Sequence, residues 1–143
     1  MLPPISLKDH FKGLWLLSRT YSTGESFHGE AIFESASDHV LSYKETGSIT
    51  TNNGQILEAW REYSYRIDST RIQIFFDTEQ TRLFQDLIFE SAAGQLHAQG
   101  THQCPPDIYK TQFTLLGPEM FEIEHDVAGP KKAYISKAVY TKF

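Results

Sequence analysis

From Gly13 onward, hydrophobic and polar residues alternate along most of the chain. This period of two is typical of β-strands, whose successive side chains point to opposite faces. Turn residues interrupt the alternation at short intervals, and Asn53-Gly54 is the strongest turn signal. We expect strands at residues 14–21, 27–35, 39–49, 55–67, 71–76, 81–91, 95–104, 107–116, 120–127 and 132–143. Only residues 4–12 look helical, with Ser6 as the expected N-cap.

The short connections between these strands leave no room for crossover helices, so neighbouring strands should pair as antiparallel hairpins. A meander of this length must hide its edges, and closure on itself removes them. The sequence therefore predicts an all-β fold: a single antiparallel up-and-down β-barrel of about ten strands with a short N-terminal helix that plugs or flanks one end. We expect residues 1–143 to form one domain.

Composition narrows the function classes. The net charge is -5 and no cluster of basic residues occurs, which argues against nucleic-acid binding. No long apolar run predicts a membrane helix, and the first residues lack the pattern of a signal peptide. The only cysteine, Cys104, excludes an internal disulfide and the cysteine-rich zinc classes. We expect a cytoplasmic protein, a monomer or weak homodimer, with no metal and no cofactor.

The more apolar side of several strands also carries large polar groups. Arg19 follows Trp15 and Leu17 on one side of its strand, and Arg61 lies between Ala59 and Tyr63 in another. Burying an isolated charge costs several kcal/mol, so a plain core would not repeat this pattern. A barrel with a ligand cavity explains it. We expect these residues to converge on one interior space: Arg19, Tyr43, Glu45, Arg61, Tyr63, His102, Cys104 and Tyr109.

The segment HQCPPDIYKTQF, residues 102–113, allows several interpretations. His102 and Cys104 are two residues apart and share one face of a strand. A metal site needs further ligands that are not identifiable, and a catalytic thiolate needs an activating cation and an oxyanion hole. A small buried thiol is one alternative, and a cavity wall is another. We expect the two side chains to lie side by side on an inner face, with Tyr109 returning beside them after the Pro105-Pro106 turn.

The arginines also allow two interpretations. In the structural interpretation, each arginine is a solvated side chain on an open strand or a partner of Glu45. In the functional interpretation, it binds the carboxylate or phosphate of a ligand. One arginine in each role is compatible with the sequence. Tyr43, Tyr63 and Tyr109 would supply walls with a hydroxyl at the tip.

Several segments together resemble the uncharacterised DUF6314 family. They are KGLWLLSR, FHGEAIF, YKETG, REYSYRI, the motif H-x-C-x-x-D-x-Y at residues 102–109 and the motif V-x-G-P-x-K-x-Y at residues 127–134. The opening Gly13-x-Trp15 also resembles the start of lipocalins and other calycins. The resemblance implies a calycin-like barrel and implies little about function.

Three functions remain open. The favoured one is binding of a small, partly apolar ligand with an anionic or hydrogen-bonding group inside the barrel. The first alternative is a haem-binding, nitrobindin-like barrel in which His102 or His125 ligates iron. The second is a small enzyme that uses His102, Cys104 and Tyr109 in acid–base chemistry.

Overall fold

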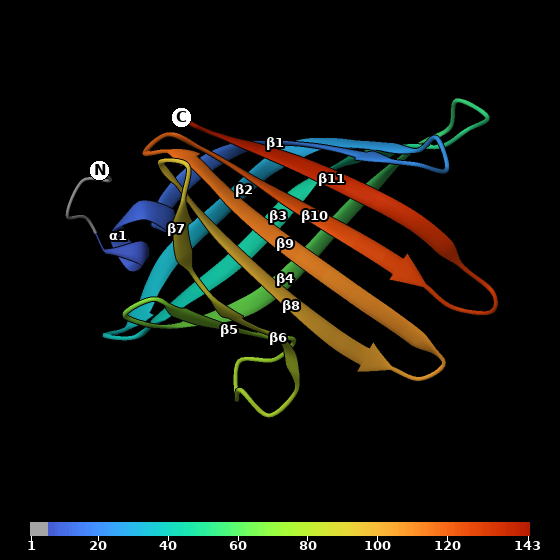
Figure 1. The fold of residues 1–143 in the computed structure, drawn as a ribbon. Coiled ribbons are helices and arrows are strands. Elements are labelled where there is room, and N and C mark those ends of the chain that lie inside the picture. Colours follow the sequence, from blue (N-terminus) through green and yellow to red (C-terminus); the bar gives the residue numbers. More distant parts are fainter. Residues whose placement is uncertain (1–5) are drawn as a thin grey trace.

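The computed structural model describes residues 6–143, so the first two residues of the expected helix at 4–12 lie outside the described part. One short helix, α1, and an eleven-stranded antiparallel sheet make up the fold (Figure 1). The elements are α1 Leu7–Phe11, β1 Gly13–Tyr21, β2 Ser26–Ser37, β3 Val40–Thr50, β4 Ile56–Asp68, β5 Arg71–Phe75, β6 Leu83–Ile88, β7 Glu90–Ala92, β8 Gln95–Cys104, β9 Asp107–Gly117, β10 Met120–Ala128 and β11 Ala133–Lys142.

The sheet curls into a nearly closed up-and-down barrel, which confirms the predicted fold class. Consecutive strands pair as hairpins from β1 to β6 and from β7 to β11, and β1 also pairs with β11. The predicted Asn53-Gly54 turn joins β3 to β4, where Gly54 has φ +82° and donates its N–H to the Thr51 carbonyl at 3.0 Å. The order along the sheet is therefore β6-β5-β4-β3-β2-β1-β11-β10-β9-β8-β7.

The expected strand 81–91 is two strands, because the chain changes partners at Phe89. β6 pairs with β5, whereas β7 pairs with β8 at the opposite edge of the sheet. We call the line where these two edges meet, between β6 and β8, the seam of the barrel. The Phe89 side chain points into the core and its N–H bonds to the Thr70 carbonyl at 2.8 Å. This one segment thus crosses from one edge of the sheet to the other.

A second irregularity closes the rest of the seam. The register of β5 and β6 shifts at Phe84, so Phe84 and Gln85 are both buried although they are adjacent in sequence. Gln85 reaches over Gly100 of β8 and donates from Nε2 to Oγ1 of Thr111 at 2.9 Å and to the Tyr109 carbonyl at 3.2 Å. A side chain thus replaces the missing strand-to-strand ladder.

The N-terminal helix plugs one end of the barrel, as predicted. Ser6 caps it by accepting a hydrogen bond from the Asp9 N–H at 3.1 Å. Phe11 is fully buried and packs edge-on against Phe121, at 5.0 Å between ring centroids. The Phe11 carbonyl accepts the Trp15 indole N–H at 2.8 Å. The aromatic core therefore fills this end.

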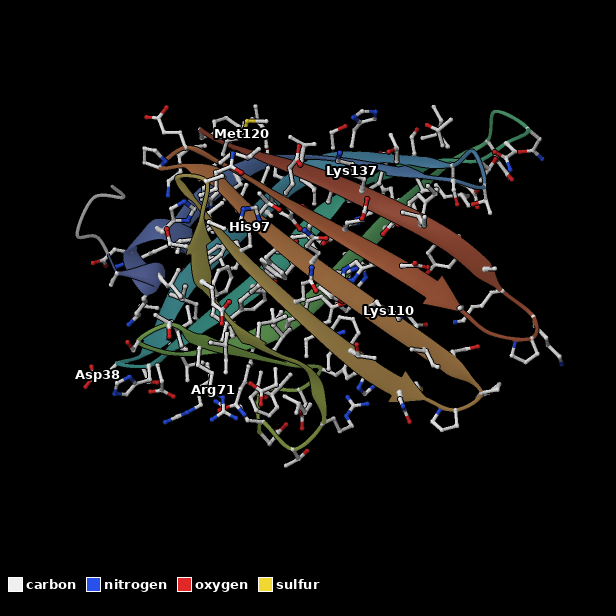
Figure 2. All side chains as sticks on the ribbon, viewed as in Figure 1. Asp38, Arg71, His97, Lys110, Met120 and Lys137 are labelled. Carbon is white, nitrogen blue, oxygen red and sulfur yellow. The ribbon has the colours of Figure 1, made fainter. Side chains whose placement is uncertain are left out.

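The alternation of side chains separates interior from surface along most strands. Charged residues such as Arg71, Lys110 and Lys137 lie on the outer surface (Figure 2). The inner side loses burial toward the ends remote from α1. Leu57, expected to face inward, is 47% exposed there, because β4 extends past the interior.

Candidate functional site

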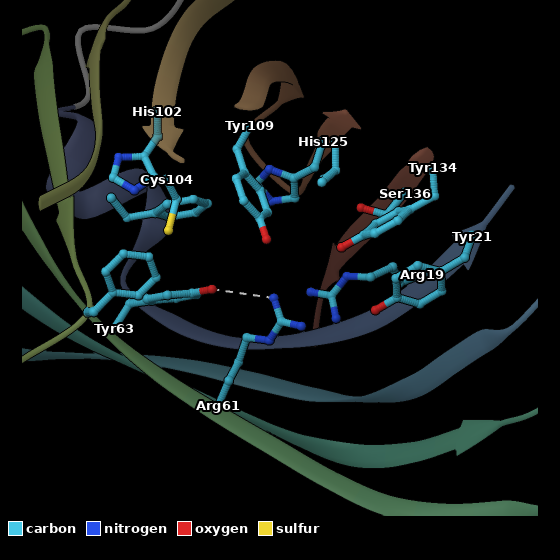
Figure 3. A pocket seen from close by; sticks show the side chains of 13 residues that line it. Arg19, Tyr21, Arg61, Tyr63, His102, Cys104, Tyr109, His125, Tyr134 and Ser136 are labelled. Atoms are coloured by element: carbon cyan, nitrogen blue, oxygen red, sulfur yellow. Dashed lines mark hydrogen bonds between the residues drawn. The ribbon is translucent and has the colours of Figure 1, made fainter. Parts of the chain in front are cut away.

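A cavity of about 260 Å³ lies at the end of the barrel opposite α1 (Figure 3). Its residues come from the C-terminal ends of β1, β8 and β10 and from the N-terminal ends of β9 and β11, which all meet at that end of the barrel. β4 and β6 supply the opposite wall. The up-and-down topology thus brings together residues that are far apart in the sequence.

A buried ion pair forms the floor of this cavity. Nη1 and Nη2 of Arg19 donate to the two carboxylate oxygens of Glu45 at 2.8 and 2.9 Å. Tyr43 donates its hydroxyl to Glu45 at 2.6 Å and also contacts the Tyr140 hydroxyl at 2.8 Å. Both partners of the ion pair are at most 5% exposed, and this bidentate geometry is the strongest form of an arginine–carboxylate contact.

The ionisation of this pair follows from its surroundings. Burial by itself would raise the pKa of Glu45, but the hydrogen bonds and charge of Arg19 outweigh it, and the pKa is lowered. Burial raises the pKa of Tyr140 to about 12, so its hydroxyl stays neutral. Glu45 is therefore a carboxylate and Arg19 a guanidinium at neutral pH.

Arg61 is the second guanidinium at the site, and its contacts are weaker. Its Nε lies 3.5 Å from a Glu45 oxygen that Arg19 already binds, and its Nη1 donates to the Tyr63 hydroxyl at 3.4 Å. The side chain is 40% exposed. Figure 3 shows the guanidinium groups of Arg19 and Arg61 approaching each other across the cavity.

His125 lines the same cavity in its neutral form. Burial, together with the charges of Arg19 and Arg61, lowers its pKa to about 4. Its Nδ1 is 2.8 Å from Oγ1 of Thr111, which also accepts a hydrogen bond from Gln85. This chain ties the histidine to the residue that closes the barrel seam.

Aromatic rings form the wall opposite the arginines. Phe84 lies at the centre and stacks on Tyr63, with centroids 5.8 Å apart and planes 13° from parallel. Phe76 and His102 contact the same ring at 4.9 and 5.6 Å. The cavity therefore has a cationic half and an aromatic half.

Two motifs singled out in the sequence meet at the mouth. Lys132 donates to the Tyr109 hydroxyl at 2.8 Å and lies 3.3 Å from a carboxylate oxygen of Asp107. A Cβ on Gly129 would lie 2.0 Å from Oδ1 of Asp107, so a larger residue there would displace that carboxylate from its present position. The H-x-C-x-x-D-x-Y and V-x-G-P-x-K-x-Y segments thus build one structure at the rim.

Six of the eight predicted site residues line the cavity: Arg19, Arg61, Tyr63, His102, Cys104 and Tyr109. Tyr43 and Glu45 lie behind Arg19 and hold it. His102 and Tyr109 are paired across β8 and β9, as expected. Cys104 is exposed at the rim, which corrects the alternative of a buried thiol: the inner side of β8 reaches solvent at its last residue. Binding of a ligand by these residues stays a prediction.

The other cavity residues were not predicted as a site: Tyr21, Phe76, Phe84, Val127, Tyr134, Ser136 and, except as a haem ligand, His125. A signal for His125 existed, because alternation in β10 places it on the inner side with Ile123 and Val127. No such signal existed for Phe84, since the register shift in β6 breaks the alternation.

A family described as "Family of unknown function (DUF6314)" matches residues 11–142. The chain belongs to this family. The resemblance inferred from its motifs is thereby confirmed. Membership of a family of unknown function does not indicate an activity. Among curated proteins, none matches the chain significantly.

Solved structures with the same fold include two that cover nearly the whole chain. The S-type phycobiliprotein lyase CPES from Guillardia theta has a TM-score of 0.66 and 7% identity, covering 98% of this chain and 94% of its own. EF1p2_mFAP2b bound to DFHBI has a TM-score of 0.52 and 13% identity, covering 94% of both chains. At this identity the likeness shows the fold alone, and it fits the expected calycin-like barrel.

Residues 6–143 contain no group of three or more His, Cys, Asp or Glu side chains placed to hold a metal ion. Within the same residues, no helix has the length and apolar character needed to span a membrane.

Proposed function

We propose that the protein binds a small, partly apolar ligand with an anionic group in the cavity between Arg61 and Phe84. The observation that carries this proposal is a surplus of positive charge. Arg19 and Arg61 contribute two positive charges and Glu45 contributes one negative charge. His125 adds none, because its pKa is about 4. One cationic charge at the site therefore lacks a counterpart among the described residues.

The geometry assigns that surplus to Arg61. Glu45 gives both its oxygens to Arg19 at hydrogen-bond distance, and one of them also accepts from Tyr43. Arg61 is left with two long contacts and an exposed edge toward the cavity. A guanidinium favours planar, bidentate partners, and a carboxylate or phosphate supplies one.

The aromatic half of the site supports a partly apolar ligand. Most ligand sites combine apolar walls with a few placed polar groups, and Phe84, Phe76 and Tyr63 provide such a wall here. A solved structure of the same fold has a small molecule, DFHBI, bound to it, and this supports the proposal. We also propose that the protein is calycin- or lipocalin-like, that it is cytoplasmic, and that it is a monomer or a weak homodimer.

Native mass spectrometry of the protein purified from its own host tests the proposal. We expect a bound small molecule in the wild type and its loss in Arg61→Met. Arg66→Met is the matched control, because Arg66 lies on the same strand with a side chain 41% exposed and points to the outer face beside Asp68. Equal occupancy in Arg61→Met would contradict the proposal, and so would a wild type that carries no bound mass and binds none of the small anions titrated into it.

A further inference from the structure

The size of the cavity limits what it can hold. An apolar cavity of about 150 Å³ takes one benzene ring. At about 260 Å³, this cavity has room for one ring and a short polar arm. Extended ligands with several fused or linked rings would protrude from its mouth.

The apolar half is lined by aromatic rings that pack on one another. The Phe84 ring has both stacked and edge-on neighbours. The Tyr63 ring plane lies 13° from that of Phe84, whereas the planes of His102 and Tyr109 lie 76° and 79° from it. Aromatic rings favour these two arrangements, and such pairs contribute beyond the area that they bury. An aromatic ring fits such surroundings better than an alkyl chain.

The polar half presents donors that lack an acceptor. Lys132 has only donors, so the Tyr109 oxygen accepts its hydrogen bond and the Tyr109 O–H remains free to donate. Figure 3 shows this hydroxyl pointing toward the guanidinium groups of Arg61 and Arg19. Nε of Arg19 is also buried and without a partner among the described residues. The Tyr109 hydroxyl and the Arg61 guanidinium thus both offer donors to the cavity, and an anionic acceptor between them would satisfy both.

We propose that the cavity is a site for a single-ring aromatic monocarboxylate. The carboxylate accepts hydrogen bonds from Arg61 and Tyr109, and the ring packs against Phe84. A single negative charge matches the single surplus charge of the site, and a second carboxylate would be buried without a partner. This inference rests on the proposed function and names its ligand class.

Lys132 acts as a positioning residue in this site. It is held by Asp107 at 3.3 Å and fixes the Tyr109 hydroxyl from the rim, at 2.8 Å. The ammonium lies over the Tyr109 ring, 5.3 Å from its centroid. Lys132 should therefore affect binding indirectly, by orienting Tyr109. Its loss should weaken the binding of a charged ligand more than that of a neutral one.

Four probes of similar size test the ligand class in calorimetric titrations of the full chain: 3-phenylpropionate, its neutral analogue 3-phenylpropan-1-ol, the aliphatic hexanoate and the dianion phthalate. We expect 3-phenylpropionate to bind most tightly. The alcohol should bind about 10- to 100-fold more weakly, since it loses hydrogen bonds to charged groups. Hexanoate should bind about 2- to 10-fold more weakly, since it loses the aromatic contacts.

Variants locate the site. Arg61→Met and Tyr109→Phe should each weaken 3-phenylpropionate while leaving the alcohol unchanged, which a general structural defect would not do. Lys132→Met should do the same to a smaller degree, and Lys132→Arg should restore binding. Lys137→Met is the control, because Lys137 lies on the outer face near Glu122 and should leave every affinity unchanged.

The outcomes separate this inference from the proposed function. Equal or tighter binding of hexanoate or phthalate, or a co-purified ligand of another class, overturns the aromatic monocarboxylate and leaves an anion-binding cavity in place. Equal binding of the alcohol and the carboxylate removes the role of Arg61 and Tyr109. If none of the probes binds and native mass spectrometry shows no bound mass, the proposed function fails as well.

Discussion

At the scale of single residues, the two arginines of the cavity differ in role although they occupy equivalent places in the alternation of their strands. Arg61 is the direct cross-strand partner of Glu45 between β3 and β4. Arg19 nevertheless makes the bidentate contact, although β2 lies between β1 and β3. Barrel curvature brings β1 toward β3 across the interior. The sequence predicts that all three residues face inward, but it does not contain this curvature, so it leaves open which arginine is paired.

This difference predicts unequal effects on stability. Arg19→Met leaves the Glu45 carboxylate buried without its partner. Glu45→Gln likewise leaves the Arg19 guanidinium buried without a counter-charge. Each should lower the free energy of unfolding by about 3–5 kcal/mol. Arg61→Met should lower it by less than about 1 kcal/mol, because that side chain is 40% exposed and its contacts are long. Urea denaturation of the three variants measures these values.

Acid denaturation provides the control. Because the folded-state pKa of Glu45 is lowered, the pair contributes fully above the ordinary pKa of a glutamate, and its contribution is lost as pH falls through the folded-state value. Glu45→Gln should therefore reduce the loss of stability on acidification, whereas Arg61→Met should preserve it. Equal stability of all three variants would show that the pair is not buried in solution.

At the scale of elements, the strands follow from hydrophobic alternation, and the exceptions lie where the barrel closes. The alternation predicts one strand over residues 81–91, yet the register shift at Phe84 and the change of partner at Phe89 divide it. Both features satisfy contacts with β8 and β9, strands that come later in the chain. Local sequence patterns do not contain such long-range contacts. For the same reason, Phe84 was absent from the predicted site.

The seam itself predicts a sensitive position at Gly100. A Cβ there would lie 2.5 Å from Oε1 of Gln85 and 2.9 Å from Cδ2 of Leu87. Gly100→Ala should therefore push β6 away from β8 and lower the free energy of unfolding by about 1–3 kcal/mol. Urea denaturation measures the loss, and hydrogen exchange of the β6 amides should become faster.

Neighbouring changes test the cause. Thr101→Ala, next to Gly100 but exposed, should leave both measurements unchanged. The combination of Gly100→Ala with Gln85→Ser should cost less than the sum of the two separate changes, because the shortened side chain makes room for the new methyl group. A wild-type stability for Gly100→Ala would show that the strands part more easily at the seam than these distances allow.

At the scale of the whole molecule, the barrel has two unlike ends. Phe11 and the aromatic cluster around it fill one end, and the cavity with its two guanidiniums occupies the other. The succession of hairpins predicts the barrel, and the helical segment at residues 4–12, with Ser6 as its N-cap, predicts a helix that plugs or flanks one end. The depth of the cavity was not predictable, because it depends on how far β4, β8 and β10 extend beyond the core.

This architecture also bears on the haem hypothesis. His125 and His102 both line the cavity, but its volume of about 260 Å³ suits one ring with a short arm. The four pyrrole rings of haem are larger than this. We therefore expect hemin titrated at neutral pH to give no Soret band that depends on either histidine. His28→Ala, an exposed change on β2, is the control for surface binding of hemin. A shifted Soret band that persists in His28→Ala and disappears in His102→Ala or His125→Ala would show that the barrel opens enough to ligate iron, and would replace the small anion with haem.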